Sequence, residues 1–184
     1  MKGFGDIYNS EVKKKKAKKK KLTKNDVINL AINNHVKGNI NEALKYYKIA
    51  INQGFADEVV FANYGLILKD YGKLKDAEIY TLKAIELNPN FANAYSNLGG
   101  VLRDLGKLKD AEIYTLKAIE LDPNSALSRS NMASILKDLG KLKDAEIYAR
   151  EAIELDPNFQ DAYYNLGSIL SLIHISEPTR PSSI

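Results

Sequence analysis

Cysteine is absent from the 184-residue sequence, which rules out disulfide bonds, cysteine-ligated zinc and a thiol nucleophile. The N-terminal stretch "MKGFGDIYNSEV" lacks the apolar segment of a secretory signal, and no run approaches the ~20 apolar residues of a membrane span. These absences argue against a secreted or membrane-spanning chain. We therefore expect a cytoplasmic protein.

Recognisable catalytic motifs are also missing. The only two histidines, His35 and His174, lie far apart in the sequence and have no cluster of possible metal ligands around them. No phosphate-binding loop or nucleophile motif follows a strand, because no convincing strand pattern exists. We predict a binding scaffold without enzymatic activity, cofactor or metal, and we expect His35 to be a solvated or capping residue.

The segment Lys13–Lys21 contains no acidic residue and has lysine at eight of its nine positions. The whole chain has a formal charge of +4, but residues 22–184 hold 18 Lys or Arg against 21 Asp or Glu, a net charge of −3. Like charges without apolar neighbours predict a disordered arm. Its role is either that of a solvated segment or that of a weak, salt-dependent contact with polyanions such as nucleic acid, the ribosome or anionic membranes.

A period of 34 residues organises the rest of the sequence. The segment "GKLKDAEIYTLKAIEL" at 72–87 recurs letter for letter at 106–121, and "GKLKDAEIY" returns at 140–148. A fixed period of this length indicates a repeat array. The units are 24–57, 58–91, 92–125, 126–159 and a partial fifth from 160. The expected organisation is a disordered lysine-rich arm at 1–22, an array at 23–170 and a non-repeat tail at 171–184.

Each unit reads as a helical hairpin. In the second unit Phe61, Tyr64 and Leu68 lie on one stripe of a first helix, and a glycine at 72 ends that helix. Proline at 89 ends the second helix, because proline cannot continue it. Small residues at Gly65, Gly99 and Gly167 predict a close approach between helices. One hairpin cannot cover its own apolar stripe, so the hairpins must stack.

The letters of the unit resemble the tetratricopeptide repeat (TPR). Unit 92–125 carries the family pattern as Tyr95, Leu98, Gly99, Leu102, Ala111, Ala118 and Pro123. The resemblance spans about residues 24–170 and implies an all-α fold, a right-handed α-solenoid of 34-residue helix-turn-helix repeats. Arg129 stands at the position where three other units have the aromatic residues Phe61, Tyr95 and Tyr163, which predicts a weaker or rotated contact. The first unit ends in "NQGFAD" without proline, so the pattern does not predict how the chain leaves the second helix of this unit.

One position of the first helices is asparagine in every unit. Asparagine is a mediocre helix former, so its repetition calls for a reason. One interpretation is structural, with each amide capping or bridging adjacent repeats. The other is a peptide-binding groove, in which a row of amides holds the backbone of an extended peptide, as the resemblance to the repeat arms of bacterial-type O-glycosyltransferase-like proteins implies. The residues are Asn29, Asn63, Asn97, Asn131 and Asn165.

The resemblance implies a protein-protein interaction scaffold whose concave groove, lined by first helices, holds a peptide or partner segment. The alternative is the N-terminal recognition arm of a larger transferase or oxygenase. Chaperone-binding members of the family grip a C-terminal carboxylate with lysine and arginine, but the repeated groove position here is asparagine, so we do not expect that clamp. The identical second helices are explained by recent copying of a repeat at the DNA level.

The last residues depart from the repeat. The eleven residues "LSLIHISEPTR" at 170–180 resemble the in-frame translation of a transposon end and adapter used in sequencing libraries. On this interpretation His174 and Arg180 have no function, and the native chain continues with the missing second helix. The unpaired last first helix exposes apolar residues such as Leu170, which predicts self-association through the uncapped C-terminal repeat.

Overall fold

The computed structural model describes residues 22–176, and every regular element in that range is an α-helix. The all-α prediction is therefore confirmed for this part of the chain. The lysine-rich segment Lys13–Lys21, with its predicted polyanion contact, and residues 177–184 of the tail lie outside the described residues. No helix between residues 22 and 176 is both long enough and apolar enough to cross a lipid bilayer.

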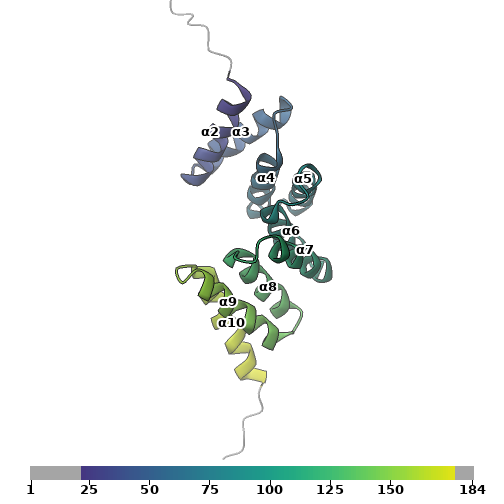
Figure 1. The fold of residues 1–184 in the computed structure, drawn as a ribbon, viewed down its shortest axis with the longest axis vertical. Helices are drawn as coiled ribbons and strands as arrows, with labels where there is room; N and C mark the ends of the chain where they lie inside the picture. The colour runs from purple at the N-terminus through teal and green to yellow at the C-terminus, as the bar shows by residue number, and fades with distance from the viewer. Residues whose placement is uncertain (1–21, 177–184) are drawn as a thin grey trace, which may run out of the picture.

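The helices follow the 34-residue period, with the first helix of each unit starting at residue 24, 58, 92, 126 or 160. They form four hairpins and one further helix, stacked into a curved array with α2 and α10 at opposite ends (Figure 1). Their bounds are α2 Lys24–Val36, α3 Ile40–Asn52, α4 Glu58–Asp70, α5 Leu74–Leu87, α6 Ala92–Asp104, α7 Leu108–Leu121, α8 Ala126–Asp138, α9 Leu142–Leu155 and α10 Gln160–Ser176.

Each hairpin turns at a glycine in the left-handed conformation. In the turn from α4 to α5, Gly72 has a φ of 71°, which side-chain-bearing residues rarely adopt. The Lys73 N–H donates to the Leu68 carbonyl at 2.9 Å and the Gly72 N–H to the Lys69 carbonyl at 2.8 Å, forming a Schellman cap. The predicted role of glycine in ending the first helix is confirmed. The same positive φ occurs at Gly38, Gly106 and Gly140.

The junctions between hairpins use two different exits. Asn88, which follows α5, has an extended φ of −141° and ψ of 93°, the conformation that a following proline favours. The first junction has no proline. There α3 ends one residue earlier in its unit, Gly54 adopts a φ of 68°, and the Phe55 N–H donates to the Ala50 carbonyl at 2.8 Å. Gly54 thus provides the exit that the sequence pattern left open.

The two helices of a hairpin approach most closely at their smallest residues. A Cβ placed on Gly65 would lie 2.5 Å from the Thr81 hydroxyl oxygen, and one placed on Gly99 would overlap the Thr115 hydroxyl oxygen. The predicted close approach is therefore confirmed at these two glycines. It does not occur at Gly167, where a Cβ would have no neighbour within 4 Å, because no helix follows α10 in the described part of the chain.

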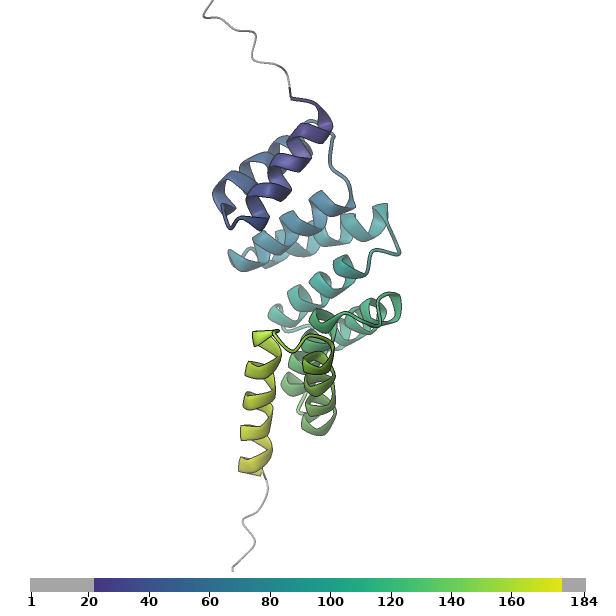
Figure 2. The same cartoon turned by 60° about the vertical axis from the view of Figure 1, so that its left-hand side comes forward.

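Hairpins stack through their first helices: α4 packs against α3, and each later first helix packs against both helices of the hairpin before it. Helix α6 contacts α4 and α5, α8 contacts α6 and α7, and α10 contacts α8 and α9. Among the described residues no comparable contact joins α5 to α7 or α7 to α9. First helices therefore lie on the inner side of the curve and second helices on the outer side, an arrangement that can be followed in Figure 2. This is an all-α solenoid.

The duplicated letters form repeated ion pairs on the outer side. Lys107 Nζ lies 2.7 Å from Glu78 Oε1, and Lys141 Nζ lies 2.7 Å from Glu112 Oε1, so each "GKLKDAE" copy pairs with the copy before it. At the first junction Leu44 stands at the glutamate position, and this pair is missing. Exposed pairs of this kind contribute only about 0.2–1 kcal/mol each.

Arg129 makes a polar contact at the position where the second and third units stack two rings. Phe61 stacks on Tyr80 at a centroid distance of 6.0 Å, and Tyr95 stacks on Tyr114 at 6.2 Å. Arg129 Nε instead lies 3.0 Å from Glu151 Oε2, and its guanidinium donates to the Pro123 carbonyl. The departure from the repeat pattern is thus accommodated by an ion pair with α9.

Candidate functional site

The repeated asparagines follow the inner side of the array, because each occupies the same position of a first helix. The structure gives them different surroundings. Asn29 is exposed, whereas the other four are half-buried. They lie on successive first helices, Asn29 on α2, Asn63 on α4, Asn97 on α6, Asn131 on α8 and Asn165 on α10.

The last two amides bridge adjacent repeats. Asn131 Nδ2 donates to the Ser96 hydroxyl at 3.0 Å and to the Ser96 carbonyl at 3.3 Å. Asn165 Nδ2 repeats this contact one unit later, at 2.9 Å from the Ser130 hydroxyl and 3.3 Å from the Ser130 carbonyl. The acceptor serines are buried. The geometry at these two positions is that of the structural interpretation, a connection between consecutive first helices.

Asn63 is used in a different connection, at the junction between the first two hairpins. Its side chain hydrogen-bonds the hydroxyl of Tyr47, a fully buried residue of α3. Burial raises the pKa of Tyr47 to about 12, even though the hydrogen bond from Asn63 lowers it. The hydroxyl of Tyr47 therefore stays protonated at neutral pH and holds α4 against α3.

Asn97 has no hydrogen-bond partner for its side chain within residues 22–176. The reason lies one repeat earlier, where Ala62 occupies the position that Ser96 and Ser130 fill for the last two asparagines. Without a hydroxyl there, the half-buried amide of Asn97 keeps its two donors and its acceptor for another molecule. A polar group held in this way on the inner face is a candidate binding group.

Three cations, Lys69, Arg103 and Lys137, stand in the last turns of the first helices α4, α6 and α8. Lys69 of α4 reaches across to α6, where its Cδ would lie 4.0 Å from a Cβ on Gly100, one turn after Asn97. Arg103 Nε lies 2.6 Å from Asp138 Oδ2 of α8, an ion pair between consecutive first helices. Lys137 Nζ likewise reaches the Ser168 hydroxyl on α10 at 3.4 Å. Lys69 Nζ lies 3.8 Å from Asp70 Oδ1, so each of the three cations has a polar partner within the array.

The sequence analysis did not identify Ser96, Ser130 or Tyr47 as partners of the asparagines. The signal for the serines was present, since each stands 35 residues before the asparagine that binds it. Position 62, which lies 35 residues before Asn97, is alanine, and for this reason Asn97 lacks the serine partner that Asn131 and Asn165 have. Tyr47 had no comparable signal, because its partner lies in the next hairpin and the contact depends on how the two hairpins dock.

His35 differs from its predicted role as a solvated or capping residue. It is half-buried, its Nδ1 lies 3.3 Å from the Tyr47 hydroxyl oxygen, and the two rings meet edge to face at 6.0 Å. Burial lowers the pKa of His35, while the charge of Asp70 raises it. His35 therefore belongs to the polar connection that Tyr47 and Asn63 form between the first two hairpins. In residues 22–176 no three His, Asp or Glu side chains gather in a group that could hold a metal ion.

Comparison with known proteins gives the family. Models of the tetratricopeptide repeat match residues 60–91, 90–158 and 148–177, which together run from the second hairpin through α10. No curated protein sequence matches the chain.

Solved structures of the same fold are similar at low sequence identity. The first TPR of Spaghetti (RPAP3), bound to the HSP90 peptide SRMEEVD, is 22% identical, with a TM-score of 0.59 over 64% of this chain and 94% of that one. YrrB, described as a TPR protein with an unusual peptide-binding site, is 23% identical, with a TM-score of 0.63 over 77% and 73%. A chain of the APC/C hetero-tetramer Cut9-Hcn1 is 20% identical, with a TM-score of 0.73 over 81% of this chain and 30% of that one.

These similarities show a shared fold, and they agree with the 34-residue period, the glycine turns and the stacked hairpins. This chain is a tetratricopeptide repeat protein.

Proposed function

We propose that this chain is a protein-interaction module that binds an extended peptide segment across the inner face of α4, α6 and α8. The observation that carries the proposal is the side-chain amide of Asn97 on α6, which is half-buried and has no hydrogen-bond partner within residues 22–176. An amide in that setting can donate to a peptide carbonyl and accept from a peptide N–H at the same time. Peptide binding by the Spaghetti TPR and by YrrB supports the same class of partner.

The charges in the last turns of α4 and α6 favour recognition of the peptide main chain over recognition of a terminal carboxylate. Arg103 is held by Asp138, and the side chain of Lys69 has Asp70 Oδ1 at 3.8 Å. Each cation near the end of a first helix is followed in sequence by an aspartate, as in Lys69-Asp70 and Arg103-Asp104. The rim is therefore close to neutral. We expect a peptide with an amidated C-terminus to bind as well as the same peptide with a free carboxylate.

The test starts from a random peptide library displayed to the whole chain, followed by affinity measurements with a selected peptide. Replacing Asn97 with alanine should weaken binding about 2- to 13-fold, the equivalent of one lost hydrogen bond worth about 0.5–1.5 kcal/mol. Asn97→Asp keeps the shape and the acceptor oxygen but replaces the NH₂ donor with a second, charged acceptor, so it should weaken binding as well.

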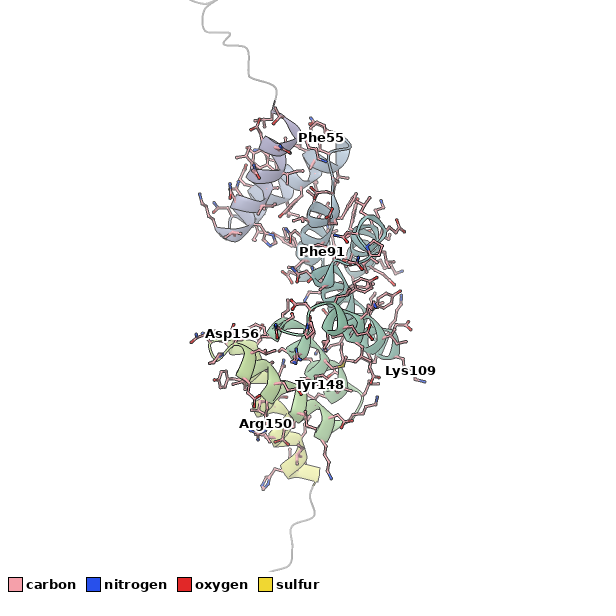
Figure 3. The ribbon with its side chains drawn as sticks, in the orientation of Figure 1. Phe55, Phe91, Lys109, Tyr148, Arg150 and Asp156 are labelled. Carbon is pink, nitrogen blue, oxygen red and sulfur yellow. The ribbon has the colours of Figure 1, made fainter. Side chains whose placement is uncertain are left out.

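The matched control is Lys109→Ala on α7, whose side chain projects away from the array on its outer side (Figure 3). This variant should bind like the unchanged chain. Selected peptides that bind equally to the Asn97 variants, or that lose affinity with Lys109→Ala, would overturn the proposal.

A further inference from the structure

Two aromatic and two aliphatic side chains line an open cavity on the third repeat. Tyr95 of α6 stacks on Tyr114 of α7, with the ring centroids 6.2 Å apart. Ile113 and Leu116 of α7, which are 63% and 41% exposed, lie beside these rings. The cavity has a volume of about 500 Å³. A cavity of this size with mainly apolar walls has room for a small ligand or for one side chain of a partner.

The same ring pair in the second repeat shows which chemical group such a surface attracts. Phe61 stacks on Tyr80 at a centroid distance of 6.0 Å. The ammonium nitrogen of Lys83 lies over both rings, 5.8 Å from the Phe61 centroid and 5.1 Å from the Tyr80 centroid. The electron-rich faces of aromatic rings attract cations at these distances. In the second repeat the chain's own ammonium group therefore occupies this place.

In the third repeat the corresponding lysine is paired elsewhere. Lys117, at the position of Lys83, has its Nζ 2.9 Å from Glu120 Oε2. Within residues 22–176 no lysine or arginine lies over the ring of Tyr95 or Tyr114. The ring pair is therefore open to a cation from another molecule, and Glu120, which also lines the cavity, provides a negative charge beside the rings.

The fourth repeat has replaced both groups. Arg129 stands at the position of Tyr95 and Glu151 at that of Lys117, and Arg129 Nε lies 3.0 Å from Glu151 Oε2. A cation of the chain is thus held at this place in the second and fourth repeats, by two rings in one and by a carboxylate in the other. Of these three repeats, the third combines two rings with no cation of its own over them.

We propose that the cavity beside Tyr95 and Tyr114 binds the alkylammonium group of a lysine side chain, plain or methylated, from another molecule. The two rings attract the cation, the carboxylate of Glu120 supplies the opposite charge, and the two aliphatic side chains contact the hydrocarbon part of the ligand. Asn97 follows Tyr95 by two residues and so lies about 200° further round α6. The site is therefore separate from the proposed peptide contact at Asn97 and does not rest on it.

The first test is an NMR titration of the whole chain with Nα-acetyl-Nε-trimethyl-lysine amide. Its methyl protons should shift upfield on binding, because ring currents shield protons that lie over ring faces, and the ring protons of Tyr95 and Tyr114 should shift with the same binding constant. The neutral isostere, with carbon in place of the charged nitrogen, should bind about 2- to 30-fold more weakly, the range of a cation-ring contact. Equal binding of the isostere would overturn the proposal.

Two further comparisons locate the site and identify the ligand. Tyr95→Leu and Tyr114→Leu each remove one ring and should weaken binding, whereas Tyr71→Leu, which changes an exposed ring at the end of α4, should bind like the unchanged chain. Tetramethylammonium, which has no hydrocarbon chain for Ile113 and Leu116 to contact, should bind more weakly than the lysine derivative. Equal affinity for the two cations would contradict the assignment to a lysine side chain.

Two lysine variants test the site without changing the rings, and both alter exposed side chains, so the fold should be kept. Lys117→Ala removes a competing cation at the cavity and frees the carboxylate of Glu120, so it should tighten binding of the lysine derivative. Lys83→Ala uncovers the Phe61–Tyr80 pair and should add a second site, seen as shifts of the Tyr80 ring protons. Weaker binding with Lys117→Ala, or no response of Tyr80 with Lys83→Ala, would overturn the proposal.

Discussion

Gly99 of α6 lies directly against the hydroxyl of Thr115 on α7, and one repeat later the equivalent residues are Ala133 and Ala149. Both alanines are fully buried in the same cluster. Both members of the pair therefore differ between the two repeats: the first helix has alanine in place of glycine, and the second helix has alanine in place of the larger threonine. A constant volume at the hairpin contact explains why glycine is kept where threonine faces it.

This relationship predicts a strong coupling between the two positions. Gly99→Ala overlaps Thr115, and Gly99→Ala with Thr115→Ala reproduces the pair found in the next repeat. We expect the alanine at 99 to be more favourable by about 1–3 kcal/mol when position 115 is also alanine, the usual size of an overpacking penalty. The measurement is a double-mutant cycle of urea unfolding. Additive effects of the two substitutions would contradict the close contact.

The two identical second helices provide a matched comparison of one buried hydroxyl. Thr81 Oγ1 donates to the Ala77 carbonyl at 2.7 Å, whereas Thr115 Oγ1 is buried without a partner in the described residues. Thr81→Ala should therefore reduce the free energy of unfolding by about 0.5–1.5 kcal/mol more than Thr115→Ala does. Thermal denaturation of the two single variants under one condition compares them. An equal loss in both would show that the hydroxyls have the same environment.

The repeated asparagines should differ in what they contribute to stability. Asn131→Ala removes the bond to Ser96 and leaves the buried serine hydroxyl unpaired, so it should cost about 1 kcal/mol or more. Asn97→Ala removes no internal hydrogen bond and replaces asparagine with a better helix former, so stability should stay the same or rise by a few tenths of a kcal/mol. Chemical unfolding of the two variants compares their free energies of unfolding. A larger loss for Asn97→Ala would contradict the assignment.

The buried surroundings of His35 predict a dependence of stability on pH. Burial lowers its pKa below the ordinary value of 6.5, so the unfolded chain binds a proton more readily than the folded chain does. The contribution of neutral His35 is complete above pH 6.5 and is lost as the pH falls from that value through the lower pKa of the folded state. His35→Gln should flatten this part of the profile. An unchanged slope between pH 7 and pH 5, measured against Asn124→Gln as an exposed control, would rule out the buried histidine as its source.

The parts of the structure that were predictable from the sequence depend on neighbours along the chain. Gly72 and Pro89 end helices through local backbone geometry, and the spacing of Phe61, Tyr64 and Leu68 sets the face that packs. The partners of the asparagines were not predictable in this way, because Ser96 and Ala62 decide them from a neighbouring repeat. α10 continues through Leu172 and Ile173 to Ser176, so the boundary expected at residue 170 does not coincide with the end of a helix.

The central claim is that a peptide lies along the inner face at α6, and the most direct measurement follows side-chain amides by NMR during titration with a selected peptide. The NH₂ resonances of Asn97 should shift strongly and saturate with the binding constant. Those of Asn131 and Asn165, which remain bonded to Ser96 and Ser130, should move less. Shifts confined to α5 and α7, with Asn97 unchanged, would contradict the account by placing the peptide on the outer face.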